Sequence, residues 1–176
     1  MAIDATRIFK PINLAILTIS DTRTPDTDTS GDILASRVTD AGHKLIVRDI
    51  IKDDAKLLSN KYNGWVMDKR IDVIISTGGT GLTGRDVTIE ALKNLKGSRE
   101  IPGFGELFRW LSYKSIGTST IQSRACAVVV DSTYIFALPG SNGAVKDGWD
   151  GILKEQLDSR NRPCNFVELM PRLSEK

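Results

Sequence analysis

The chain has 176 residues, and its 24 Lys and Arg against 22 Asp and Glu give a formal net charge of +2. A chain of this length buries roughly 70% of the surface that it exposes when unfolded, so a single domain spanning residues 1–176 is expected. The two signs of charge are interspersed, which argues against nucleic acid or an anionic membrane as a partner. No apolar segment approaches the roughly 18 residues of a membrane span, and the N-terminus lacks a signal-peptide pattern, so a cytoplasmic location is expected.

Residues 1–11 form an N-terminal arm without periodicity, which we expect to be loosely ordered or to pack against another subunit. The apolar run 12–19 is typical of a central parallel strand. A polar loop, 21–30, follows this strand and leads into a helix over residues 31–41. Ser30 is a favourable N-cap for that helix.

The segment 44–51 alternates apolar and polar residues and predicts a strand less buried than its neighbours. His43, the only histidine, has no Ser, Cys or second His nearby in sequence, so we expect it at the surface or in a turn. Asp53 and Asp54 follow the strand and begin a helix that runs to about Lys69. The helix dipole favours acids in a first helical turn, which is the simplest explanation for this pair.

The stretch 71–90, IDVIISTGGTGLTGRDVTIE, combines a buried strand, a glycine loop and the start of a helix. The strand is expected to end near Thr77. Four of the seven residues in the loop 78–84 are glycine, so its amides can turn toward an anion. Asp86 and Thr88 offer N-cap oxygens to the next helix. Together these features predict an anion-binding site.

Two standard nucleotide motifs are not met. Gly79, Gly81 and Gly84 satisfy G-x-G-x-x-G, but that fingerprint needs a βαβ unit with an acid at the end of the next strand. Glu100 lies near the required spacing, yet no apolar strand precedes it. An NAD-dependent oxidoreductase therefore remains only a third hypothesis. A phosphate P-loop is excluded because no Lys-Ser or Lys-Thr follows the glycines.

The segment 101–117 predicts a helix whose apolar residues recur at i, i+3, i+4 and i+7. These residues are expected in the core or in a subunit contact, with Glu106 on the opposite face. The polar segment 118–124 adds about one more helical turn. Two β runs, 125–130 and 134–138, predict a hairpin and hence an antiparallel pairing in an otherwise parallel sheet.

Pro139, Gly140 and Ser141 end the last strand, and Asn142 begins the final long helix. Residues 159–176 form a C-terminal tail with a short apolar stretch. Cys126 and Cys164 lie far apart in the sequence and have no metal-binding spacing, so two reduced thiols are expected.

Several of these loops follow parallel strands and should therefore meet at one edge of the sheet. Asp21, Asp28 and Ser30 could face the same ligand as the glycine loop. Asp53 and Asp86 would place two carboxylates beside it. Such a pair could hold Mg²⁺, which takes few protein carboxylates and completes its shell with phosphate oxygens and water.

Six local sequences, in register along nearly the whole chain, resemble the MoaB/Mog molybdenum cofactor biosynthesis family. They are LTISD (17–21), DTSG (28–31), STGGTGLTGRDVT (76–88), PGFGELFR (102–109), SR (123–124) and LPGS (138–141). The tail sequence LDSRNRPCNF looks more like the MoaB branch than the Mog branch. Ile89 departs from the proline that many relatives have after the R-D-V-T motif.

The resemblance implies a three-layer α/β/α sandwich that binds molybdopterin, a pterin with a dithiolene and a terminal phosphate. Active members transfer AMP from Mg-ATP to that phosphate and release pyrophosphate. By this resemblance, Asp53 and Asp86 are the catalytic and Mg²⁺-binding acids. The remaining positions that it marks for substrate binding are Asp21, Asp28, Ser30, Gly31, Gly78, Gly79, Thr80, Gly81, Glu106, Ser123, Pro139, Gly140 and Ser141.

Two hypotheses from different classes follow. The first is an enzyme, a molybdopterin adenylyltransferase that uses ATP and Mg²⁺. The second is a pterin-binding or assembly protein of the same fold with little catalysis, because some MoaB-like members do not carry the adenylylation. The resemblance also suggests a homotrimer or a dimer of trimers.

Overall fold

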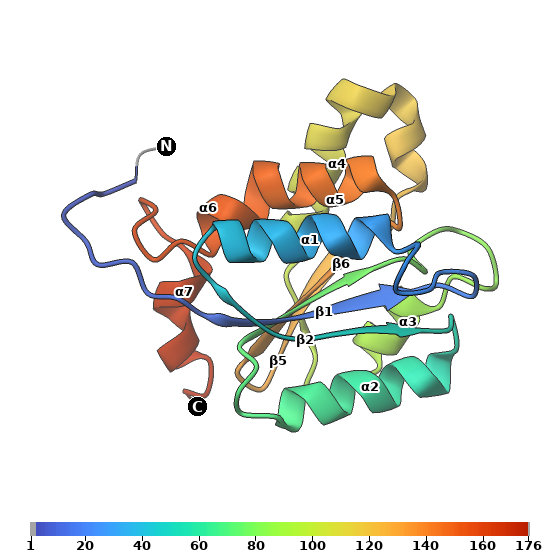
Figure 1. Cartoon of the computed structure of the whole chain (residues 1–176), viewed down its shortest axis with the longest axis horizontal. Coiled ribbons are helices and arrows are strands. Elements are labelled where there is room, and N and C mark those ends of the chain that lie inside the picture. Colours follow the sequence, from blue (N-terminus) through green and yellow to red (C-terminus); the bar gives the residue numbers. More distant parts are fainter. Residues whose placement is uncertain (1–2, 176) are drawn as a thin grey trace.

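The computed structural model describes residues 3–175, so Met1, Ala2 and Lys176, which end the predicted arm and tail, lie outside the described residues. The elements, shown in Figure 1, are β1 (Asn13–Ile19), α1 (Thr29–Asp40), β2 (Lys44–Ile51), α2 (Ala55–Met67), β3 (Val73–Thr77), α3 (Thr88–Lys93), β4 (Arg99–Glu100), α4 (Pro102–Ile116), η1 (Gly117–Gln122), β5 (Cys126–Val130), β6 (Thr133–Leu138), α5 (Asn142–Gly148), η2 (Trp149–Leu153), α6 (Lys154–Gln156), α7 (Phe166–Leu169) and η3 (Met170–Arg172). Both η1 and η3 are 3₁₀ helices, whereas η2 is a π-helical turn that joins α5 to α6.

The strands form one six-stranded sheet in the order β2-β1-β3-β6-β5-β4. The first four are mutually parallel, and β5 and β4 run antiparallel to their neighbours. The predicted α/β fold and the 125–138 hairpin are therefore confirmed. The sequence did not predict β4, because this strand has only two residues, both exposed, and no apolar run marks it.

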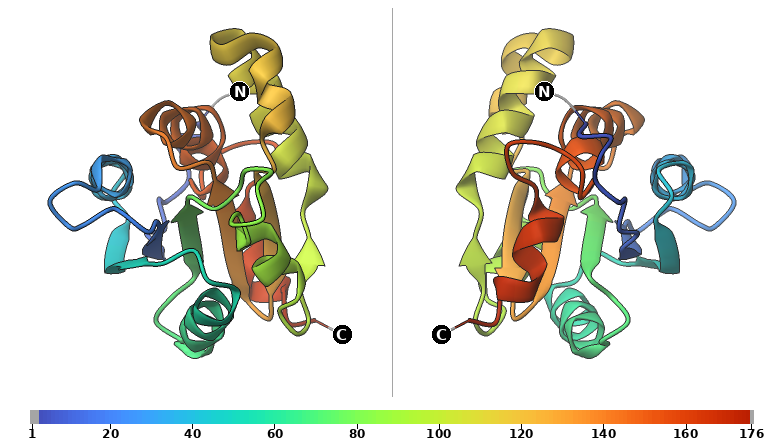
Figure 2. Two further views of the ribbon diagram at one scale, coloured as in Figure 1. Left: turned by 90° about the vertical axis from the view of Figure 1, so that its right-hand side faces the viewer. Right: turned by 90° about the vertical axis from the view of Figure 1, so that its left-hand side faces the viewer.

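Helices pack on both faces of the sheet, as the views in Figures 1 and 2 show. Helices α1, α4 and α5 share one buried core with one set of strand side chains, which includes Ile16, Ile75 and Phe136. Helices α2 and α3 share the second core, which includes Leu17 and Ile74 from the opposite sheet face. Alternate residues of a strand point to opposite faces of the sheet. Both sets are apolar in the central strands because helices cover both faces.

His43 is buried, so the expectation that it lies at the surface is wrong, but it does belong to the turn that ends α1, where its amide donates to the Val38 carbonyl at 3.1 Å. Its side chain is 6% exposed and packs between the rings of Phe9 and Trp149, whose centroids lie 5.2 and 6.5 Å away. Its Nδ1 accepts a hydrogen bond from the Ile12 amide at 3.4 Å. Burial lowers the pKa of His43. The sequence did not reveal the burial of His43, because Phe9, whose ring covers it, belongs to the N-terminal arm.

The arm packs against the tail of its own chain, although the sequence predicted loose order or contact with another subunit. The amide of Asp4 donates to the carbonyl of Arg160 at 3.0 Å. Arg7 donates to the carbonyl of Ser159 at 2.8 Å and forms an ion pair with Glu168. These contacts join the two ends of the described chain.

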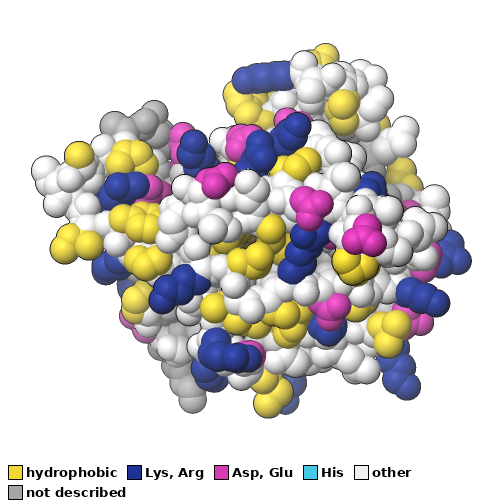
Figure 3. All heavy atoms as spheres, viewed as in Figure 1, with side chains coloured by type: hydrophobic (Ala, Val, Ile, Leu, Met, Phe, Trp, Pro, Cys, Tyr) yellow, Lys and Arg dark blue, Asp and Glu magenta, His cyan; other side chains and the backbone are white. Residues whose placement is uncertain are grey.

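Charges of both signs are scattered over the face of the molecule seen in Figure 3. This agrees with the interspersed charges of the sequence. Within residues 3–175, no helix combines the length and the apolar character needed to cross a membrane. Cys126 and Cys164 are both free thiols, as expected.

Candidate functional site

The carboxyl ends of β1, β2, β3 and β6 lie at one edge of the sheet because these strands are parallel. Antiparallel β5 starts at this same edge, which brings Ser123, just before β5, to the loops after the parallel strands. This is the edge at which open α/β sheets bind ligands.

The glycine loop leaves β3 in a conformation that requires glycine. Gly78 and Gly79 have φ values of +110° and +62°, which L side chains rarely adopt. A Cβ on Gly78 would also lie 2.1 Å from the carbonyl oxygen of Ile19. The hydroxyl of Thr88 donates to the Gly78 carbonyl at 3.0 Å, and its amide donates to the Gly79 carbonyl at 3.1 Å. The loop therefore packs directly on the end of β1 and the start of α3.

A cavity of about 620 Å³, here called the main cavity, opens beside this loop. Its lining includes nine of the residues that the sequence singled out: Gly78, Gly79, Thr80, Gly81, Asp86, Ser123, Pro139, Gly140 and Ser141. The volume is in the range of small-molecule sites. The structure thus brings the glycine loop and the β6–α5 turn together around one space.

The opposite wall of the main cavity was missed by the sequence reasoning. It includes Ser112, Ser115 and Ser119 from α4 and η1, and Asp147 from α5. The hydroxyls of Ser112 and Ser115 donate to Asp147 Oδ2 at 3.3 and 3.2 Å. The only sequence signal was the spacing of the three serines, which places small polar residues on one helical face.

Asp53 lies against the glycine loop. Its Oδ1 accepts a long hydrogen bond from the Val87 amide at 3.4 Å. A Cβ on Gly79 would lie 2.9 Å from both carboxylate oxygens of Asp53, so only glycine leaves room for the acid. Burial raises the pKa of Asp53, and the negative charges of Asp86 and Asp21 raise it further.

Asp86 lies in the same loop but in a different environment. Its Oδ2 accepts hydrogen bonds from the Thr83 amide at 2.9 Å and the Thr83 hydroxyl at 2.6 Å. These bonds lower the pKa of Asp86. The prediction that Asp86 and Thr88 cap the following helix is wrong, because α3 begins after Val87 without a side-chain cap. Asp86 closes its own turn instead.

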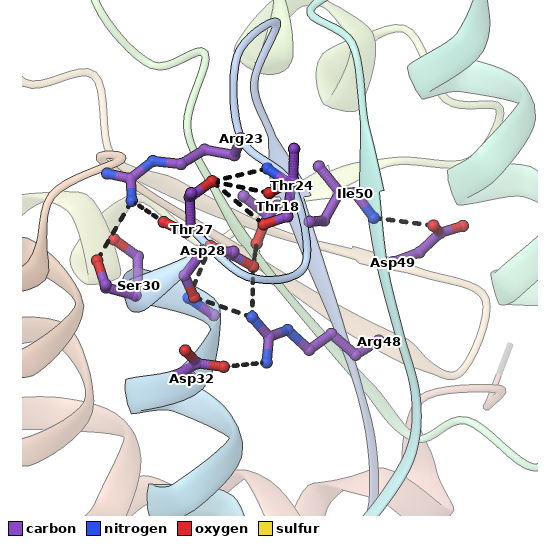
Figure 4. Close-up of polar contacts among 12 residues, drawn as sticks. Thr18, Arg23, Thr24, Thr27, Asp28, Ser30, Asp32, Arg48, Asp49 and Ile50 are labelled. Carbon is purple, nitrogen blue, oxygen red and sulfur yellow. Dashed lines mark hydrogen bonds and ion pairs between the residues drawn. The ribbon is translucent and has the colours of Figure 1, made fainter.

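Asp28 is fully buried beneath the loop after β1, as Figure 4 shows. Its Oδ1 accepts from the Gly31 amide at 3.0 Å, which makes Asp28 the N-cap of α1. Its Oδ2 accepts from the Thr18 hydroxyl and from Arg48 Nη2, both at 2.7 Å. Burial alone would raise the pKa of Asp28, but these hydrogen bonds outweigh it and the pKa is lowered.

Ser30 is not the N-cap that the sequence predicted. It lies inside the first turn of α1, and its hydroxyl donates to Asn142 Oδ1 at 3.0 Å. Asp28 and Ser30 line a small cavity of about 50 Å³ rather than the main cavity. Both residues lie at the predicted edge, where they support the loops.

Asp21 and Glu106 also lie apart from the main cavity. Asp21 forms an ion pair with Arg85 and lines a separate hollow beside β2. Glu106 is on the exposed side of α4, in a depression of about 540 Å³ behind the site. Ser123 lines both this depression and the main cavity.

Arg124 holds the glycine loop from behind, a role the sequence reasoning did not assign to it. Its Nε donates to the Gly81 carbonyl and its Nη2 to the Asp86 carbonyl, each at 2.7 Å. It also forms an ion pair with Glu90 of α3. The sequence marked Arg124 only through the SR motif, and it did not indicate which residues Arg124 contacts.

The dinucleotide hypothesis lacks its structural context. Helix α3 leads to β4, a two-residue edge strand that β6 and β5 separate from β3, so the glycines do not open a βαβ unit of neighbouring strands. Glu100 in β4 is exposed and pairs with Lys93 at 3.1 Å. It is therefore not placed as the ribose-binding acid of a dinucleotide fold.

The donor set is compatible with Mg²⁺ but not with a metal held by protein alone. Among residues 3–175, no three His, Cys, Asp or Glu side chains gather closely enough to hold a metal ion. Mg²⁺ usually takes one or two carboxylates and fills its shell with substrate phosphates and water. Asp53 and Asp86 meet that requirement, since they lie against one loop and the charge of Asp86 raises the pKa of Asp53.

Comparison with known proteins gives consistent matches. A family model described as a probable molybdopterin binding domain, MoCF_biosynth, matches residues 15–159. Molybdenum cofactor biosynthesis protein B of Escherichia coli (strain K12) is 46% identical over 158 residues, covering 90% of this chain and 92% of that protein. A crystal structure of molybdenum cofactor biosynthesis protein B superposes with a TM-score of 0.86 at 37% identity, covering 97% of this chain and 100% of that one. The tungsten cofactor synthesizing protein MoaB from Pyrococcus furiosus superposes with a TM-score of 0.76 at 29% identity, covering 94% and 99%.

Proposed function

Because this chain belongs to the probable molybdopterin binding domain family, we propose that it acts in molybdenum cofactor biosynthesis and binds molybdopterin in the main cavity. We further propose that it transfers AMP from ATP to the terminal phosphate of molybdopterin. The names of its relatives support the first statement. The second statement depends on Asp86, which lines the cavity, and on Asp53, which lies against the glycine loop.

The observation that carries the proposal is the position of Asp53 and Asp86 against one glycine loop, beside a cavity of small-molecule size. The loop amides lie where they can bind a phosphate. The two acids could hold a Mg²⁺ ion, whose positive charge would offset that of two reacting phosphates. A partly buried carboxyl whose pKa is raised is also more typical of a catalytic site than of a storage site.

In the proposed reaction, an oxygen of the pterin phosphate attacks the α-phosphorus of ATP. A new P–O bond forms, the bond between the α-phosphorus and its bridging oxygen breaks, and pyrophosphate leaves. Amides of Gly78–Gly81 would hold the anion, and Asp86 would keep its orientation through Thr83. Mg²⁺, bound by Asp86 and Asp53, would supply positive charge to the phosphates. No protein nucleophile is required, so positioning provides most of the catalysis.

The test is a single-turnover assay with purified protein, molybdopterin, Mg²⁺ and ATP labelled in its α-phosphate. Transfer of label into the pterin, lost when Mg²⁺ is omitted, would support the adenylyltransferase. Binding of molybdopterin without transfer would instead favour the second hypothesis, a binding or assembly protein. Failure to bind molybdopterin at all would reject both.

A further inference from the structure

The wall of the main cavity opposite the glycine loop carries an acid that the proposed reaction does not use. Asp147 is half-buried on α5 and lines the cavity together with Gly143 and Ala144. Residues at i, i+1 and i+4 share one face of a helix, so this face of α5 borders the cavity. The acids of the proposed reaction, Asp53 and Asp86, lie at the glycine loop instead.

Neutral donors hold one oxygen of Asp147, and the other oxygen has no partner. The hydroxyls of Ser112 and Ser115, both on α4, donate to Oδ2 at 3.3 and 3.2 Å. Within residues 3–175, Oδ1 accepts no hydrogen bond, and no Lys, Arg or His nitrogen lies within 4.0 Å of the carboxylate. Asp147 therefore presents an unpaired negative charge beside the cavity.

Two lysines lie in the neighbourhood without pairing with this acid. Lys114 and Lys146 line an adjoining hollow of about 420 Å³, which shares Ser115 and Asp147 with the main cavity. Lys114 Nζ lies over the ring of Trp110 instead, 4.5 Å from its centroid. The described residues that line the main cavity include no Lys or Arg. The charge of Asp147 is therefore available to a ligand in the main cavity.

The chemistry of a carboxylate limits which ring can lie against it. A carboxylate accepts hydrogen bonds and donates none, so it selects an edge with two adjacent N–H donors. The pyrimidine ring of a pterin has such an edge, formed by its 2-amino group and its N3–H. Adenine does not, because its amino group is flanked by ring nitrogens that are acceptors. Asp147 thus favours a pterin over the adenine of ATP at this wall.

The position of Asp147 along α5 suits a ligand with a phosphate at one end and a ring at the other. Ser141, which belongs to the turn beside the glycine loop, is the N-cap of α5, and Asp147 lies six positions further along the chain. An α-helix rises about 9 Å over six residues. A ligand that reaches both the turn and Asp147 must therefore be elongated, as molybdopterin is between its phosphate and its pyrimidine edge.

We propose that Asp147 determines the specificity of the main cavity for a pterin, by accepting hydrogen bonds from the 2-amino group and N3–H. The identification of that pterin as molybdopterin rests on the proposed function. Oδ1 would take one bond. The serine bonds to Oδ2 are longer than the usual 2.7–2.8 Å or so for O–H···O, which leaves Oδ2 able to take the other. Such paired, charge-assisted bonds are among the strongest hydrogen bonds that proteins make.

The experiment compares two probes that differ only at position 2 of the ring. One is the phosphate ester of 6-hydroxymethylpterin, and the other is the matching lumazine, in which an oxygen replaces the 2-amino group. Fluorescence titration gives the Kd of each. Asp147→Asn carries the test, because the asparagine oxygen can accept from N3–H while its amide donates to the 2-oxygen of the lumazine.

Asp150→Asn is the matched control. Asp150 is an exposed acid three residues further along the chain, and it does not line the main cavity. It forms an ion pair with Arg37 at 2.7 Å, and the loss of such a surface pair has little effect on stability. Both variants remove one negative charge, so the control separates the position of the charge from its number.

In the unmodified protein we expect the pterin probe to bind about tenfold or more tightly than the lumazine probe. Asp147→Asn should weaken both the pterin probe and molybdopterin about tenfold or more, and it should reverse the preference in favour of the lumazine. Asp150→Asn should leave every Kd within about twofold. A merely structural role for Asp147 would weaken both probes alike and would not reverse the preference.

Unchanged affinity for the pterin probe in Asp147→Asn, or an equal loss for both probes, would overturn the inference. Failure of the pterin probe to bind the unmodified protein would also overturn it, because its ring edge and phosphate are the groups that the cavity is proposed to hold. Guanosine monophosphate carries the same ring edge and a phosphate. If it bound more tightly than the pterin probe, the wall would belong to a purine nucleotide and the inference would be wrong.

These outcomes differ from failure of the proposed function. Molybdopterin binding that does not depend on Asp147 would keep the proposed function and reject the inference. Selection of the pterin probe by Asp147, in a protein that transfers no AMP, would support the inference and reject the transferase.

Discussion

Asp53 and Asp86 lie against the same loop, yet their surroundings shift their pKa values in opposite directions. Hydrogen bonds from Thr83 favour the ionised form of Asp86. Burial and two neighbouring negative charges disfavour the ionised form of Asp53. A divalent cation between the two acids would favour ionisation of both, because its charge offsets theirs. The two residues should therefore respond differently to mutation.

Asp86→Asn should keep the fold and molybdopterin binding but lower AMP transfer by about 100-fold or more, the size of loss seen when a key electrostatic group is removed. The asparagine can still accept the Thr83 hydrogen bonds, but it lacks the charge. Single-turnover transfer and molybdopterin affinity are the two measurements. Glu155→Gln on α6 is the control. Transfer at the unmodified rate would show that Asp86 has no charge-dependent role.

Asp53→Asn should stabilise the protein at neutral pH while lowering AMP transfer. The folded protein raises the pKa of Asp53, so folding favours the neutral carboxyl. The stability that Asp53 contributes is therefore present at pH values below its unfolded pKa, near 4, and is lost as pH rises through the folded pKa. We expect a gain of less than about 1 kcal/mol at pH 7, because Asp53 is only partly buried. Urea unfolding at pH 7 and pH 4 should show this gain shrink at the lower pH.

At the scale of elements, Asp28 joins β1, β2 and α1 through a single carboxylate. It accepts hydrogen bonds from Thr18 of β1, Arg48 of β2 and Gly31 of α1. The loop after β1 passes over this contact (Figure 4). Asp28 therefore holds Arg48, which lines the hollow beside β2, and does not reach the main cavity.

Asp28→Asn should destabilise the protein by about 2–3 kcal/mol at pH 7, because it removes the buried negative charge that pairs with Arg48 and turns an amide donor toward one of the donors that Asp28 now accepts from. The folded protein lowers the pKa of Asp28, so its contribution is present above the unfolded pKa and is lost as pH falls through the folded pKa. The cost of the substitution should shrink in acid. Asp32→Asn removes the other, exposed partner of Arg48 and should cost less than about 1 kcal/mol. Equal costs for both variants in urea unfolding would contradict this account.

Arg124→Met should loosen the glycine loop, because two backbone carbonyls lose their donors. We expect faster amide hydrogen exchange over residues 80–86 and AMP transfer slower by about tenfold or more. Arg124→Lys should rescue little, since lysine cannot donate to both carbonyls with a fixed fork. The control is Arg109→Met, because Arg109 donates to the Ser123 and Ala125 carbonyls but not to the loop. Unchanged exchange in Arg124→Met would exclude this positioning role.

At the scale of the whole molecule, the end of α4 and η1 project beyond the sheet (Figures 1 and 2). Phe104 and Phe108 belong to the core, which is one of the two places expected for the apolar residues of segment 101–117. Other large apolar side chains of α4 and η1 are exposed: Leu107, Trp110, Tyr113, Ile116 and Ile121. Exposed apolar side chains gathered in this way are typical of an interface. We propose that the homotrimer or dimer of trimers suggested by the resemblance uses this surface.

Trp110→Glu should shift the solution mass toward the monomer, because it places a charge in the proposed interface. Trp110 is 62% exposed, so the folded monomer should tolerate the change. Met67→Glu is the control, because Met67 is 78% exposed at the end of α2. Light scattering gives the mass. An unmodified protein that is already monomeric, or a variant with unchanged mass, would reject this surface as the interface.

The sequence by itself determined the elements whose patterns are local. The apolar runs of β1, β3 and β6 identified buried strands, because both faces of a central parallel strand must be apolar. The glycines of residues 78–81 identified the loop, because Gly78 and Gly79 take positive φ values that other residues resist. The motifs of the main cavity followed from these loops and from the resemblance.

Only the tertiary structure decided which side chains share a space. The serines of α4 reach the main cavity because α4 packs against α5 and β5, and nothing in the sequence of α4 indicates that Asp147 of α5 is their partner. Ser30 and Asp28 both suit an N-cap, and Asp28 occupies it because Arg48 and Thr18, distant in sequence, also bind its carboxylate. Likewise, Arg23 and Lys52 belong to different loops, and the parallel pairing of β1 with β2 brings them to the hollow beside β2. Local patterns specify elements, whereas distances between elements depend on packing.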